Sequence, residues 1–220
     1  MTKYANSAQT YDALINAAGE LAAELGFANV STRAVASRAD VNVGSLHYHF
    51  GGKDGLFEAV LRRVIDHLNA TSFSNVLTPY EKELDTPYGQ AKAVASIIQK
   101  HIDVFFDPQR PWWFSKVIYQ ALQYDSPFFR LVSTEVIKPM SAVVYNLLDR
   151  IKPGMSREEK VFYNTLFLSF CAMHSQYRTP ILHELAKVDF SSSYIEHLAE
   201  LSIHVAQQAL GLPSVQGDKS

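Results

Sequence analysis

The residues whose types and spacing could do chemistry lie in the segment 41–57, which reads VNVGSLHYHFGGKDGLF. Leu46 and Phe50 are four positions apart and can share the buried face of a short helix. The other faces then carry hydroxyl, imidazole and phenol groups, together with a glycine that allows close approach to the backbone. These outward residues are Val43, Gly44, Ser45, His47, Tyr48 and His49. Such a compact polar and aromatic surface suits a helix that contacts a nucleic-acid groove.

Two preceding helices are predicted to position this segment. Apolar residues recur at three- and four-residue spacing over residues 8–25 and predict a first helix that stops at Gly26. Ser31 or Thr32 can cap a second helix that ends near Asp40, and Asn42 can cap the third. Two short helices joined by so tight a turn predict a helix-turn-helix.

A long fourth helix is predicted after Gly51 and Gly52, which break the third helix. Lys53 stands at the start of the fourth helix, where a cation opposes the helix dipole. A phosphate at the same place would offset that cost, so Lys53 is a candidate phosphate contact. A freely solvated lysine is the alternative interpretation.

Composition and charge limit the classes of protein to which the chain can belong. It has 220 residues, 47% of them apolar, and a formal net charge of −2. Residues 1–67 contain six Lys or Arg and seven Asp or Glu, so any DNA affinity must depend on the placement of charges and not on a strong field. The single Cys171 excludes an intrachain disulfide and is expected to be a buried thiol. Without a signal peptide or an apolar run of about 18 residues, a soluble cytoplasmic protein is expected.

Helical patterns continue through the rest of the chain. They cover approximately residues 87–106, 111–123, 127–151, 156–177 and 192–210, with breaks near 107–108, 125–127, 153–154 and 179–180. The pattern weakens over residues 72–88, which we expect to form a connection. No alternating period-2 run of useful length occurs, so the predicted fold class is all-α.

The order of these parts resembles the TetR family of transcriptional regulators. The resemblance rests on residues spread over positions 10–61. They are Ala17, Ala18, Leu25, Gly26, Phe27, Ser31, Val35, Ala36, Ala39, Val41, Gly44, Leu46, Tyr48, His49, Phe50, Lys53 and Leu56. The segments HYHFGGKDGLF and YQALQYDSPFFRLVSTEVIKPM look like the CecR (CerR) branch of that family.

The resemblance implies that the second and third helices dock in the DNA major groove, one half-site for each protomer of a two-fold dimer. It assigns DNA contacts to Thr32, Arg33, Val43, Gly44, Ser45, His47, Tyr48, His49 and Lys53. Val43, Gly44 and Ser45 would face base edges, whereas the last four would bind phosphates. Two positions depart from the family pattern: Asp40 replaces the usual glycine of the turn, and His47 stands where tyrosine is common. Aspartate tolerates left-handed backbone better than most residues.

The resemblance also implies the domain organisation. Residues 1–54 would form a three-helix DNA-binding domain, and the long helix that follows would join it to a ligand-binding and dimerisation domain, residues 55–220. The terminal helices, residues 156–177 and 192–210, would pair with those of a second copy as a four-helix bundle.

Residues 105–129 contain nine aromatics in 25 positions, against 12% for the whole chain. A densely packed core explains such a stripe, and a pocket for a flat or apolar molecule is the functional alternative. Candidate ligand-binding residues are His101, Phe105, Trp113, Gln120, Gln123, Phe129, Phe167 and His174, with Asp103 as a further polar candidate. Trp112 and Trp113 cannot both point inward from one helix.

Three kinds of site have little support in the sequence. His197, Glu200 and His204 share a helical face, but a solvated face explains them as well as a metal does. No catalytic or phosphate-cradling motif occurs, so no cofactor is expected and an enzyme that uses the aromatic cavity is the alternative. A helix-turn-helix that binds protein instead of DNA is a third hypothesis.

The leading hypothesis is a homodimeric repressor, not an enzyme, released from a palindromic operator by a small apolar or aromatic inducer.

Overall fold

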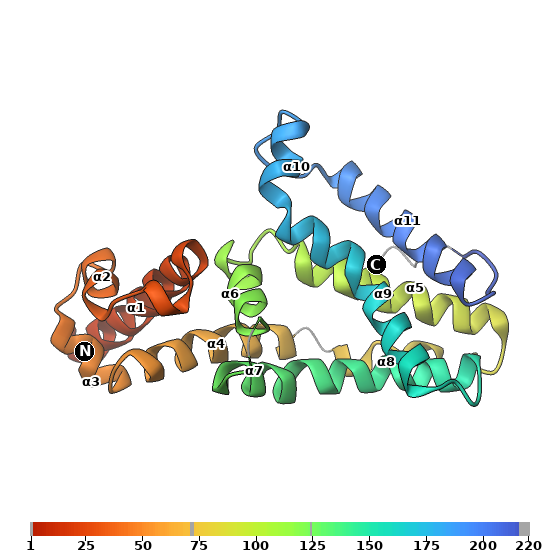
Figure 1. Cartoon of the computed structure of the whole chain (residues 1–220), viewed down its shortest axis with the longest axis horizontal. Coiled ribbons are helices and arrows are strands. Elements are labelled where there is room, and N and C mark those ends of the chain that lie inside the picture. The colour runs from red at the N-terminus through yellow and green to blue at the C-terminus, as the bar shows by residue number, and fades with distance from the viewer. Residues whose placement is uncertain (1, 71–72, 124, 216–220) are drawn as a thin grey trace. The chain divides into compact units, whose positions relative to one another are not determined.

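The computed structural model describes residues 2–70, 73–123 and 125–215, and every regular element in these ranges is a helix (Figure 1). The α-helices are α1 (Thr2–Leu25), α2 (Thr32–Arg38), α3 (Val43–Phe50), α4 (Lys53–Ala70), α5 (Pro87–Phe105), α6 (Trp113–Ala121), α7 (Pro127–Val132), α8 (Lys138–Ile151), α9 (Arg157–Gln176), α10 (Arg178–Glu184) and α11 (Ser192–Ala209). Short 3-10 turns occur at η1 (Phe27–Asn29), η2 (Phe73–Asn75) and η3 (Thr78–Tyr80), and a π-helical turn, η4, covers Ser133–Ile137. The predicted all-α fold class is confirmed.

The chain forms two compact units. Unit 1 comprises Met1–Ala70 and Arg110–Val136, and unit 2 comprises Thr71–Gln109 and Ile137–Ser220. These units are defined by packing, whereas the division at residue 54 concerns function, and that division stays a prediction. Within the part of the chain that the structure describes, no helix is long and apolar enough to cross a membrane.

Unit 1 is built around α1, which packs against α2, α4 and α6. The apolar stripe predicted for the first helix is buried, with Leu14 and Ala18 inaccessible to solvent. Leu46 of α3 and Leu56 of α4 are also completely buried. This small core therefore holds the two short helices α2 and α3 against two longer ones.

Unit 2 has α5 at its centre, because α5 packs against α8, α9 and α11. Its core is a cluster that includes Ile97, Ile98, Leu147 and Phe167, all completely buried. Cys171 is buried in a smaller cluster, as predicted, and this burial raises the pKa of its thiol to about 12. The thiol is therefore protonated, and not nucleophilic, at neutral pH.

The predicted helices are found, with two differences from the expected pattern. The break expected at residues 179–180 lies instead at Tyr177, directly after α9, and the short helix α10, which was not predicted, covers residues 179–180. Pro180 falls in the first turn of α10, where the backbone N–H that proline lacks has no partner within the helix in any case. The helix expected over residues 127–151 is interrupted by the π-helical turn η4. Pro139 follows this turn and cannot donate to the carbonyl four residues before it, which accounts for the irregular turn.

Candidate nucleic-acid interface

The helix-turn-helix is held by a side-chain cap at the start of each of the helices α2 and α3 and by one left-handed residue in the turn between them. The Ala34 N–H donates to Ser31 Oγ at 3.1 Å, and the Gly44 N–H donates to Asn42 Oδ1 at 2.7 Å. Asp40 has a φ of 54°, so it takes up the left-handed conformation usually given to glycine. Both helices thus begin at the expected caps, and the predicted helix-turn-helix is present.

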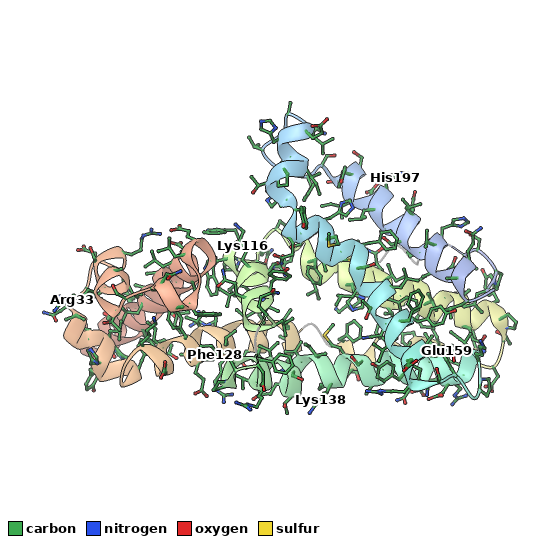
Figure 2. All side chains as sticks on the ribbon, in the orientation of Figure 1. Arg33, Lys116, Phe128, Lys138, Glu159 and His197 are labelled. Carbon is green, nitrogen blue, oxygen red and sulfur yellow. The ribbon has the colours of Figure 1, made fainter. Side chains whose placement is uncertain are left out.

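The outward face of α3 presents several of the predicted DNA-binding residues to solvent. Tyr48 is 84% exposed, and Val43, Gly44 and His47 are also exposed, whereas Ser45 is half-buried. Arg33 projects from α2 into solvent and Thr32 is half-buried (Figure 2). Gly51, with a φ of 71°, ends the helix. The structure therefore brings the nine candidates together on α2, α3 and the first residue of α4.

His49 differs from the other candidates because it packs against α1. Its ring centroid lies 5.9 Å from that of Tyr11, and Tyr11 stacks on Phe50 at 4.8 Å. Tyr11 was not among the predicted site residues, although it lies three positions before Leu14 on the apolar stripe of α1. The edge-to-face contact with Tyr11 orients His49 and limits the part of its imidazole that remains free for a phosphate.

Lys53 has a defined partner at the start of α4. Its Nζ donates to the carbonyl oxygen of Ala28 at 3.0 Å and lies 5.9 Å from the centre of the Phe57 ring. Lys53 is therefore not a freely solvated lysine. An ammonium group has three donors, so the bond to Ala28 fixes its position and leaves donors for a phosphate.

The arginines near the helix-turn-helix differ in their availability. Arg38 pairs with Glu20 and Glu24, and Arg63 pairs with Asp12, so these guanidinium groups hold α2 and α4 to α1. Neither Arg33 nor Lys53 forms an ion pair with any described side chain of residues 7–70. Among the described side chains, these two are therefore cations that the surface can offer to DNA without breaking an ion pair.

The eight ligand-binding candidates are divided between the units. Trp113, Gln120, Gln123 and Phe129 belong to unit 1, whereas His101, Phe105, Phe167 and His174 belong to unit 2. Trp113 and Phe167 are core residues, at 1% and 0% exposure. The two grooves described in unit 2 are lined by other residues, among them Asp103. The assignment of these eight residues to a ligand stays a prediction.

Polar atoms of the candidates have very different surroundings. Gln123 is exposed and donates to the Tyr119 carbonyl, and His174 Nδ1 lies 2.9 Å from the Tyr194 hydroxyl. In contrast, His101 Nδ1 and Gln120 Oε1 are buried and make no hydrogen bond with any described residue. Buried polar atoms without partners are uncommon, and these two atoms belong to different units of the chain.

Burial of His101 predicts a pH dependence of stability. Its ring lies 5.0 Å from that of Phe73, and burial lowers the pKa of its imidazole to about 4. The unfolded chain, with a histidine pKa of about 6.5, binds the proton more readily, so stability falls as pH drops through 6.5 towards 4. We expect urea denaturation to show a loss of about 2 kcal/mol between pH 7.5 and pH 5 from this residue.

The variant His101→Leu isolates this contribution, because the carboxylates that titrate over the same range are common to both proteins. The difference in the free energy of unfolding between parent and variant should shift by about 2 kcal/mol between the two pH values. If the difference in the free energy of unfolding did not change with pH, the imidazole of His101 would accept a proton as readily in the folded protein as in the unfolded chain.

The N-terminal region is similar to known transcriptional regulators. Residues 14–60 match the family model described as "Bacterial regulatory proteins, tetR family". The chain is 27% identical over 130 residues to the "Probable HTH-type transcriptional regulator YttP" of Bacillus subtilis, covering 59% of this chain and 58% of that protein. It is 30% identical over 110 residues to the HTH-type transcriptional regulator BetI 2 of Chromohalobacter salexigens, covering 46% of this chain and 50% of that protein. The matched region thus spans only about half the length of each of these relatives.

Solved structures share the fold. A transcriptional regulator from Rhodococcus sp. Rha1 superposes with a TM-score of 0.60 at 22% identity, covering 93% of this chain and 98% of that one. AmtR of Mycobacterium smegmatis superposes with a TM-score of 0.56 at 17% identity, covering 92% and 94%. The names of both relatives describe HTH-type transcriptional regulators, a probable one in the case of YttP.

Proposed function

We propose that this chain, whose residues 14–60 match the TetR-family model, is a homodimeric TetR-family transcriptional repressor that responds to a small molecule. The observation that carries the proposal is the exposed outer face of α3, capped at Asn42 and ended at Gly51. A cytoplasmic location follows from the need to meet DNA and is part of the proposal. The membership of the CecR branch is also part of the proposal.

On DNA, α3 would lie in the major groove with its N-terminal residues towards the bases. Val43 supplies methyl groups that suit thymine, and Ser45 supplies a hydroxyl that can bond a base edge. His47, Tyr48 and His49 would bind phosphates, together with Arg33 and Lys53. The fixed bond from Lys53 to the Ala28 carbonyl supports this role, because a preorganised ammonium loses little side-chain entropy on binding.

Two copies of the chain would place two such helices on a palindromic operator. The exposed apolar side chains of the terminal helices support dimerisation through α9 and α11. Phe162 is 64% exposed, Met173 52% and Leu201 46%. Large apolar side chains at this exposure favour burial against a second copy.

A small apolar or aromatic inducer would release the operator by favouring a conformation in which the two helix-turn-helix regions of the dimer no longer fit the DNA. Unit 1 contains a contact through which such a conformational change can reach the helix-turn-helix. Phe27, in the turn after α1, lies 5.0 Å from Phe57 of α4 and 5.2 Å from Phe128 of α7. Movement of α7 would therefore press on the same turn that carries the Ala28 partner of Lys53.

A gel-shift experiment tests the reading face. Ser45→Ala should change the preferred operator sequence, because it removes a hydrogen bond to a base edge, and Lys53→Ala should weaken binding to all sequences. Loss of one phosphate contact also lowers the slope of log affinity against log salt by about 1. Glu184→Gln, at an exposed position of α10, serves as the control. Parent-like binding by both variants would show that the assigned face is wrong.

The rival hypotheses give different results in the same experiment. A helix-turn-helix that grips protein would show no steep fall of DNA affinity with salt, since counterion release causes that fall. An enzyme that used the aromatic residues would alter the inducer chemically. Recovery of an unchanged inducer from the complex therefore counts against an enzyme.

A further inference from the structure

A surface groove in unit 2 lies outside every residue assigned to DNA or inducer. It has a volume of about 620 Å³ and separates residues 74–84 from α8. Figure 1 shows these two segments side by side, the first in yellow and the second in green, and η2 contacts α8 directly. The volume falls within the range of small-molecule sites, which is about 300–1,000 Å³.

The floor of the groove is apolar and fixed in place. Leu84 and Leu147 line it and are 6% and 0% exposed, so both are anchored in the core of unit 2. Leu77 and Val143 complete the apolar lining and are half-buried. A ligand with an apolar body could therefore remove further apolar surface from water at this floor.

The charged groups around the groove leave one carboxylate uncompensated. Asp149 lies 2.6 Å from Lys160 Nζ, and Arg150 pairs with Asp85 at 3.0 Å. Glu81 also lines the groove, and among the described residues its carboxylate has no ion pair and no hydrogen bond. The carboxylates of Asp85, Asp149 and Glu81 thus outnumber the cations of Lys160 and Arg150. The excess negative charge lies at Glu81.

The backbone adds to this negative charge. Asp149 and Arg150 lie in the last turn of α8, where the carbonyl groups carry the negative end of the helix dipole. Glu81 follows directly after η3 and donates its own N–H to the Thr78 carbonyl at 3.5 Å. The groove therefore has the C-terminal end of α8 on one side and the carboxylate of Glu81 on the other, an arrangement that favours a cation.

We propose that this groove binds a small amphiphilic cation, an amine with a compact apolar body. The apolar body lies on Leu77, Leu84, Val143 and Leu147, and the ammonium group lies beside Glu81. The site is separate from the residues proposed for the inducer, and its occupation requires no DNA.

Three ligands with the same phenyl ring and a similar alkyl chain test the proposal: 4-phenylbutylamine, 4-phenylbutan-1-ol and 4-phenylbutyrate. At neutral pH their end groups are a positive ammonium, a neutral hydroxyl and a negative carboxylate. Ligand-observed NMR titration of the full chain without DNA should show the amine binding about fivefold more tightly than the alcohol, the ratio expected of a partly exposed ion pair. The carboxylate should bind more weakly than either.

Two variants place the binding in the groove. Glu81→Gln should reduce the amine affinity to that of the alcohol and leave the alcohol unaffected, whereas Glu184→Gln should change nothing. Asn146→Trp, at an exposed position of α8 that lines the groove, should block amine and alcohol alike. Circular dichroism on each variant verifies that the fold is retained.

Equal affinity for the three ligands would overturn the proposal, as would parent-like amine binding by Glu81→Gln or by Asn146→Trp. Tighter binding of the carboxylate would assign the groove to anions through Arg150 instead. Because DNA is absent from the titration, these outcomes are independent of the gel-shift result, and either proposal can fail alone.

Discussion

Replacing Trp113 with alanine is expected to lower the free energy of unfolding by about 3–5 kcal/mol, the usual loss for a large aromatic removed from a core. Trp113 is 1% exposed, and its indole packs against α1 at Gly19. A Cβ atom at Gly19 would lie 2.5 Å from the ring, so the indole sits where only glycine leaves room for it. Removal of the ring therefore opens a cavity between α1 and α6. Urea denaturation followed by circular dichroism measures the loss.

Trp112→Ala is the matched control. This neighbouring tryptophan is 51% exposed, and its ring has Lys116 Nζ 5.2 Å from the centroid. Loss of an exposed cation–π contact costs about 0.5–1 kcal/mol. Similar losses in the two variants would contradict the packing described for α6. A small loss at Trp113, with inducer binding abolished, would instead favour its role in a ligand site.

The two tryptophans show what aromatic density can and cannot predict. Helical geometry indicates that only one of two adjacent residues faces inward, and this is observed. Sequence spacing does not say which one, because the answer depends on the packing of α6 against a glycine almost a hundred residues earlier. The same dependence on long-range packing explains why eight ligand candidates chosen for their composition fall in two separate units.

The helix-turn-helix was predictable in more detail because its signals are local. The side chains of Ser31 and Asn42 accept hydrogen bonds from N–H groups three and two positions ahead. Gly51 ends α3 because its own backbone is left-handed. The partners of Lys53 and Arg63 were not predictable in this way. Their contacts join residues 25 and 51 positions apart, and no short-range pattern encodes them.

Gly55→Ala is expected to destabilise unit 1 even though the position is helical. Alanine in a helix normally stabilises by about 1 kcal/mol relative to glycine. Here a Cβ atom would lie 2.1 Å from the carbonyl oxygen of Phe50, a backbone atom that cannot rotate away. Overpacking costs up to about 3 kcal/mol, and contact with a fixed backbone atom favours the upper end of that range, so the net change is a loss of up to about 2 kcal/mol.

The substitution should also weaken operator binding, because it separates the end of α3 from the start of α4. Lys53 and the face of α3 would then no longer match the spacing of phosphates and bases, and we expect about a tenfold loss of affinity in a gel shift. Asn69→Ala, exposed near the end of the same helix, should leave both stability and affinity close to those of the parent.

Comparison with Ser45→Ala separates positioning from contact. Ser45→Ala removes a proposed base contact and should alter sequence preference with little change in stability, whereas Gly55→Ala should lower stability and weaken all operators alike. If Gly55→Ala were as stable as the parent and bound DNA equally well, the close approach of Phe50 to α4 would not be what positions α3. The first turn of α4 would then act only through the charge of Lys53.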